Sequence, residues 1–189
     1  MEKKTTRKNS PLAFLLQFLY GAAMGLCGMH GLLYADAASP GQLLLWVCWL
    51  VIAAAAALYG QVILHEGGHM VFGLLTGYRF VSFRIGSWMV QKENGKLRLH
   101  RYTLAGTGGQ CLMVPPDIPD GKIPYQLYNA GGALFNLFTA LPVVVLAVHC
   151  SSWMARTFWA LFCVMGLGTA LTNGIPLRVQ GVANDGANA

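Results

Sequence analysis

The sequence contains few charged residues. Asp, Glu, Lys and Arg make up only 11% of its 189 residues, and hydrophobic residues make up 55%. A soluble domain usually carries about 25% charged residues. The composition therefore excludes an ordinary soluble protein and predicts an integral membrane protein, whose length allows a single domain over residues 1–189.

Paired cysteines are lacking as well. The five cysteines are odd in number, scattered, and form no Cys-x-x-Cys pair. Four of them lie in or at the ends of apolar segments, where a cysteine behaves as a small hydrophobe. The sequence therefore predicts neither a disulfide framework nor a cysteine-based zinc site. The cysteines are Cys27, Cys48, Cys111, Cys150 and Cys163.

Long apolar segments dominate what is present. Four of them, 12–34, 43–75, 125–148 and 153–173, approach or exceed the ~20 residues that a membrane-spanning helix needs. The second is too long for one simple crossing, so we expect it to tilt or to project from the membrane. The basic start and Ala35-Asp36-Ala37 leave open that the first segment is a cleaved signal peptide, although its apolar stretch exceeds the usual ~7–15 residues.

The segment between the second and third spans differs in character. Residues 78–104 are rich in β-branched, aromatic and basic side chains, and Asn94-Gly95 supplies a turn between 80–91 and 96–103. This pattern predicts a β-hairpin, and the Gly- and Pro-rich stretch that follows predicts a loop. The expected fold class is thus an all-α polytopic membrane protein of about four transmembrane helices, with a small β-hairpin inserted on the cytoplasmic side.

The distribution of basic residues predicts the orientation. Twelve of the 13 Lys and Arg residues precede the first span, lie between the second and third, or follow the fourth; only Arg156 does not. By the positive-inside rule these regions and both termini are cytoplasmic. We expect a multi-pass protein of a bacterial cell membrane, in contact with the lipid bilayer. Because the basic residues flank spans, we expect no nucleic-acid partner; the oligomeric state stays open.

The motif His65-Glu66-Gly67-Gly68-His69 lies inside the second apolar segment, where Glu66 is the only Asp, Glu, Lys or Arg. Positions i and i+4 share one face of a helix, so both imidazoles point the same way. Two imidazoles at this spacing can bind one Zn²⁺, with Glu66 as a candidate general base. A carboxylate in such a segment costs several kcal/mol unless it has a role. The alternative is a set of polar residues hydrogen-bonded inside a helix bundle.

A zinc hydrolase also needs a third protein ligand and an open position for water. Most other acids lie in tails or loops, which leaves Asp185 in Asn184-Asp185-Gly186. This triplet follows Asn173-Gly174-Ile175-Pro176 at the end of the fourth span. The proposed topology places that end on the cytoplasmic side, at the depth of the histidines. The alternative is that Asn-Asp-Gly is simply a surface turn.

Three motifs in this order resemble the site-2 protease family of intramembrane zinc metalloproteases. The first is 65–69, on a hydrophobic helix. The second is 129–136, Asn-Ala-Gly-Gly-Ala-Leu-Phe-Asn, which is similar to the Gly-Pro-x-x-x-Asn type of central helix. The third is 173–176 followed by 184–186, which resembles Asn-x-x-Pro…Asp-Gly. The resemblance covers about residues 43–187, with Gly132 where many members have Pro and a longer spacing within the third motif.

The resemblance implies zinc-dependent hydrolysis of a peptide bond in or near a transmembrane segment of another membrane protein. His65, His69 and Asp185 would bind Zn²⁺, and Glu66 would be the general base. Asn136 would donate to the oxyanion, or alternatively would make an interhelical hydrogen bond. No residues are assigned to substrate binding, although the predicted hairpin could offer an edge strand to an extended substrate.

Two other functions stay open. Another type of polytopic zinc endopeptidase would usually take its third ligand from a Glu on a different helix, but no Glu follows Glu93. A non-catalytic membrane accessory or binding protein could keep the protease fold. The chain ends four residues after Asp185, whereas family members continue into a helix that carries this residue, and this difference favours the accessory function somewhat.

Overall fold

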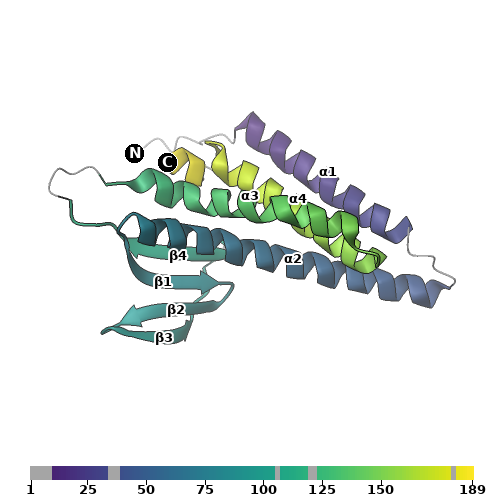
Figure 1. Cartoon of the computed structure of the whole chain (residues 1–189), viewed down its shortest axis with the longest axis horizontal. Coiled ribbons are helices and arrows are strands. Elements are labelled where there is room, and N and C mark those ends of the chain that lie inside the picture. The colour runs from purple at the N-terminus through teal and green to yellow at the C-terminus, as the bar shows by residue number, and fades with distance from the viewer. Residues whose placement is uncertain (1–9, 34–38, 105–106, 119–122, 180–181) are drawn as a thin grey trace, which may run out of the picture.

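The computed structural model of the chain describes residues 10–33, 39–104, 107–118, 123–179 and 182–189. Four long helices lie along one another in Figure 1. Their bounds are α1 Pro11–Leu33, α2 Pro40–Leu75, α3 Tyr125–His149 and α4 Trp153–Gly174. All four are long and apolar enough to cross a membrane, so the structure is compatible with a multi-pass membrane protein. The four predicted spans agree with these helices to within about three residues at each end.

Helix α2 begins at a well-formed cap. Pro40 occupies its first turn, and the Ser39 hydroxyl accepts a hydrogen bond from the Gln42 backbone N–H at 3.3 Å. The helix then runs for 36 residues, or roughly 54 Å at 1.5 Å per residue. This length exceeds the ~30 Å hydrocarbon core of a bilayer. In Figure 1 its C-terminal part continues beyond the start of α1 and carries the sheet.

The segment after α2 forms a four-stranded antiparallel sheet. Its strands are β1 Arg79–Ile85, β2 Trp88–Glu93, β3 Lys96–Arg101 and β4 Gly109–Val114, in the order β3-β2-β1-β4. The predicted turn at Asn94-Gly95 joins β2 to β3, with both residues at positive φ. The prediction of a single hairpin was nevertheless wrong. Gly86, at φ +58°, turns the chain between β1 and β2, and a stretch predicted to be loop supplies β4.

The sheet packs on the helices through β1 and β4. Tyr78, Cys111 and Met113 form a buried cluster there, and Met70 of α2 and Tyr128 of α3 pack against it. The Tyr78 and Tyr128 rings are stacked, with centroids 4.7 Å apart. This cluster fixes β4 against the C-terminal part of α2, where the histidine motif lies.

Helices α2 and α3 approach each other closely at two glycines. A Cβ added to Gly68 would overlap the backbone of Gly131, and a Cβ on Gly131 would overlap Gly68. Absence of both side chains therefore permits direct backbone contact. On the other side of the bundle α1 packs mainly on α4.

The chain after α4 folds back onto the helices. Strands β5 Arg178–Val179 and β6 Val182–Ala183 pair with each other, and the short helix α5 Asp185–Asn188 follows. Helix α5 contacts α3 and α4. This arrangement places Asp185, the first residue of α5, against the helices.

Candidate metal centre

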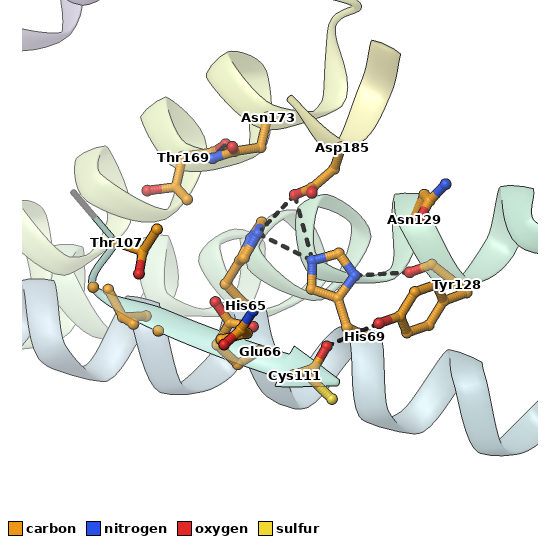
Figure 2. Close-up of a pocket in the computed structure, with 14 residues that line it drawn as sticks. His65, Glu66, His69, Thr107, Cys111, Tyr128, Asn129, Thr169, Asn173 and Asp185 are labelled. Atoms are coloured by element: carbon orange, nitrogen blue, oxygen red, sulfur yellow. Dashed lines mark hydrogen bonds and ion pairs between the residues drawn. The ribbon is translucent and has the colours of Figure 1, made fainter. Parts of the chain in front are cut away.

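Three side chains with metal-binding atoms converge at one point, as Figure 2 shows. His65 and His69 project from one face of α2, and Asp185 reaches them from the start of α5. Asp185 Oδ2 lies 2.9 Å from His65 Nε2 and 3.3 Å from His69 Nε2. The two Nε2 atoms are 3.3 Å apart. The structure therefore brings together the three residues that the sequence nominated as ligands.

Both imidazoles are oriented by hydrogen bonds at their far nitrogen. His65 Nδ1 lies 2.7 Å from Asn136 Oδ1, and His69 Nδ1 lies 2.7 Å from the Tyr128 carbonyl. Because these partners accept, each Nδ1 carries the proton and donates it. Each Nε2 then presents a lone pair to the site, as a metal-binding imidazole requires.

The donor set fits a divalent cation such as Zn²⁺. Two lone pairs and a carboxylate oxygen face one another at 2.9–3.3 Å, an arrangement that is repulsive without a cation or protons between them. Donors around a tetrahedral zinc ion with bonds of ~2.0–2.1 Å are roughly 3.3 Å apart. The position facing these donors on α3 is Gly132, where a Cβ would stand only 2.6 Å from His69 Nε2 and 2.7 Å from His65 Nε2. The glycine thus keeps the space beside the donors clear.

Asp185 is held in place by its neighbours on both sides. The Asn184 side chain accepts from the backbone N–H groups of Leu177 and Ala187, and donates to the carbonyls of Thr172 and Ile175 at 2.6 Å each. Gly186 lies so close to Gly174 that a Cβ would overlap its carbonyl.

Glu66 and the three converging residues line one pocket, which has a volume of about 400 Å³. Its side chain lies against Gly109, where a Cβ would come within 2.6 Å of Glu66 Cγ. Residues 107–111 form another part of the wall, and α2, α3 and α4 supply the rest through Val62, Tyr128, Asn129, Thr169 and Asn173. Burial, and secondly the charge of Glu66, raise the pKa of Cys111 to about 12. Cys111 is therefore a neutral thiol at physiological pH and a poor competitor for a metal.

Arg84 supports the wall of the pocket from behind. It is only 1% exposed, and its guanidinium donates to the carbonyls of Gly86 and Gly109 at 2.7 and 3.1 Å and to the Thr107 hydroxyl. No acid in the described ranges pairs with it. Its hydrogen bonds tie the β1–β2 turn to the residues that begin β4.

Asn136 does not line the pocket. It is fully buried, and its amide donates to the Gln61 carbonyl at 3.0 Å and to Gln61 Oε1 at 2.6 Å, while its oxygen accepts from His65. With both amide protons occupied, Asn136 cannot donate to an oxyanion in this arrangement. The geometry favours the alternative that the sequence left open, an interhelical hydrogen bond, and makes it a support for His65.

Sequence reasoning missed several supporting residues. Gln61 could have been found, because it is a polar residue in an apolar segment, four positions before His65 and hence on the same helix face. In the sequence, Arg84 is one of several basic residues in a β-rich segment, and no local pattern distinguishes it from the others. Tyr128 acts through its backbone carbonyl, which any residue could supply, so its role has no sequence signal.

The assembled groups can do two things chemically. Three converging donors can hold a divalent cation, and a carboxyl group in the same pocket can accept and return a proton. These are the elements of metal-assisted hydrolysis. The chain matches no protein-family model, no curated protein and no solved structure.

Proposed function

We propose that the chain is a zinc-dependent intramembrane endopeptidase that resembles the site-2 protease family. One observation carries this proposal: His65, His69 and Asp185 direct their donor atoms to one point beside Glu66, at a junction of helices of membrane-spanning length. Polar side chains that were only hydrogen-bonded in a bundle would have no need to turn three acceptors toward one another.

Each residue of the site has its own role in the proposed hydrolysis. When bound at His65, His69 and Asp185, zinc would supply Lewis-acid chemistry that activates water and polarises the scissile carbonyl. Glu66 would take the proton from the attacking water and return it to the leaving amine. Asn136 and the Tyr128 carbonyl fix the tautomers of the two histidines, so that the Nε2 lone pairs stay available.

The proposed substrate is a transmembrane segment of another membrane protein. A helical segment hides its carbonyls, so it must become extended before hydrolysis. Strand β4 is an edge strand of the sheet, and its residues Gly109, Gln110 and Cys111 line the pocket. An extended peptide that paired with this edge would lie next to Glu66. The role predicted for the hairpin thus falls to β4.

We place the protein in a bacterial cell membrane with both termini in the cytoplasm. The basic residues that support this orientation lie beside spans, as the positive-inside rule requires. The pocket lies toward the end of α2 that this orientation makes cytoplasmic, which would give water a short route to it.

The decisive experiment compares Glu66→Gln with Asp185→Ala in the purified protein. Glu66→Gln keeps the size of the side chain but cannot accept a proton, so zinc should stay near one per chain while cleavage falls by at least the ~10²–10⁴ of a general base. Asp185→Ala removes a ligand and should lower zinc affinity itself. Zinc content and cleavage of a transmembrane model substrate are measured in parallel.

The possible outcomes separate the proposed protease from the non-catalytic accessory. Cleavage by Glu66→Gln at the parental rate would exclude the hydrolytic mechanism. Full zinc content in a His65→Ala, His69→Ala double variant would exclude the metal site. A parental chain that binds zinc stoichiometrically but cleaves none of a panel of transmembrane substrates would favour the non-catalytic accessory.

A further inference from the structure

Strands β2 and β3 form the outer half of the sheet, away from the helices, and they expose an apolar face. Trp88 and Val90 of β2 lie on one face of the hairpin together with their neighbours Leu99 and Leu97 of β3, and we call these four residues the β2–β3 apolar face. Trp88 is 51% exposed, Leu97 66% and Leu99 62%. Three large apolar side chains exposed side by side are more than the scattered surface residues of a soluble domain.

This face continues the face that packs on the helices. Phe83 of β1 pairs with Val90 on one side and with Cys111 of β4 on the other, so all three share one face of the sheet. In the inner half, Phe83 and Cys111 belong to the cluster beneath α2 and α3. In the outer half the same face projects beyond α2 (Figure 1) and is covered by no described part of the chain.

The opposite face of the hairpin has a different character. Glu93 lies 3.0 Å from His100 Nε2 and 3.6 Å from Arg98 Nε, and Gln91 is the cross-strand partner of Arg98. These polar and paired groups are suited to water. The hairpin is therefore amphipathic, with a polar face and an apolar face, in the manner of an element that lies on a boundary between water and an apolar phase.

Cations border the apolar face at both ends. The Arg101 guanidinium carbon lies 4.6 Å from the centroid of the Trp88 ring, and Lys92 is the cross-strand partner of Leu97 at the other end. Tryptophan and arginine together are typical of the headgroup level of a membrane, and basic side chains there attract anionic lipids.

We propose that the β2–β3 apolar face docks into the surface of an anionic lipid leaflet beside α2. The docking rests on the membrane location proposed above and does not depend on zinc or on hydrolysis. An anionic leaflet is complementary to both the apolar side chains and the positive charges beside them. A neutral protein partner would be complementary to the apolar side chains only. Because β2 pairs with β1 and β1 with β4, the lipid contact would steady the strand that forms the wall of the pocket.

The test measures the contact of Trp88 with lipid. The purified protein is reconstituted in vesicles of phosphatidylcholine, with or without phosphatidylglycerol, that carry bromine on the upper part of the acyl chains. The contribution of Trp88 is obtained by subtracting the fluorescence quenching of Trp88→Phe from that of the parent. We expect Trp88 to be quenched by the brominated lipids, more strongly with phosphatidylglycerol, and to be shielded from aqueous iodide.

Matched variants distinguish the origins of a negative result. Arg101→Gln on the apolar face should reduce the phosphatidylglycerol effect, whereas Arg98→Gln on the polar face should not. The other four tryptophans, Trp46 and Trp49 of α2 and Trp153 and Trp159 of α4, remain in Trp88→Phe and report membrane insertion independently. If they are quenched while Trp88 stays accessible to iodide, the docking is wrong and the membrane location stands. If Trp88 is shielded from iodide but not quenched by lipid, protein covers the face and the proposal is also wrong.

Discussion

At the scale of single residues, the space beside the three donors depends on the absence of a side chain at position 132. Gly132→Ala would put a methyl group 2.6 Å from His69 Nε2 and from His65 Cε1. We expect this variant to fold but to lose most of its zinc, because the methyl group occupies the space next to the lone pairs. Zinc per chain after purification is the measurement. The control is Gly67→Ala, where a Cβ meets nothing within 4 Å; equal zinc in both variants would contradict the argument.

The residues nearest the donors were also the most predictable. Helix geometry alone predicts that His65 and His69, four positions apart, share one face. Asp185 is the one acid besides Glu66 that remains when the acids in tails and loops are excluded. Asn136 shows the limit of this reasoning. A buried amide can donate to a substrate or to a neighbouring helix, and only the position of Gln61 decides between them.

At the scale of elements, helix α5 is too short to be stable alone, so its attachment decides where Asp185 lies. Asn184→Ala removes hydrogen bonds to Leu177, Thr172 and Ile175. At roughly 1 kcal/mol per hydrogen bond, we expect zinc affinity to fall by at least about tenfold, with little change in the melting of the helical bundle. Competition with a metallochromic chelator measures the affinity.

The matched control for that variant is Asn188→Ala, in the same helix but with an exposed side chain. It should bind zinc as the parent does. Equal affinities in the Asn184 and Asn188 variants would mean that α5 is held by its other contacts with α3 and α4.

Helices and strands could be predicted where hydropathy or a turn motif specifies them. The four long helices follow from apolar length, and Asn94-Gly95 specifies its turn because both residues tolerate positive φ. The Gly86-Ser87 turn has no comparable signal in the sequence, because β-branched and aromatic residues continue on both sides of it. Strand β4 was missed because a Gly- and Pro-rich composition predicts loop, whereas pairing with β1 decides its conformation.

At the scale of the whole molecule, the distribution of basic residues predicts the orientation of the chain in the membrane. We expect position 92 to face the cytoplasm and position 151 to face outside, because twelve of 13 Lys and Arg residues then lie inside. The variants Lys92→Cys and Ser151→Cys, each with Cys150→Ala, are treated in intact cells with a membrane-impermeant thiol reagent.

Only the Ser151→Cys variant should react from outside, above the background of Cys150→Ala alone. Reaction at position 92 but not at 151 would reverse the topology and move the pocket to the opposite surface of the membrane. Permeabilised cells provide the positive control for both positions.

The backbone contact between Gly68 and Gly131 has a consequence for the two histidines beside it. With no side-chain layer between α2 and α3 at this point, a larger residue at either position would push the two helices apart. His65 and His69 each bond to a residue of α3, Asn136 and Tyr128 respectively, so such a separation would stretch both hydrogen bonds. Substitutions at the two glycines should therefore disturb the orientation of both imidazoles without altering any of the three candidate ligands.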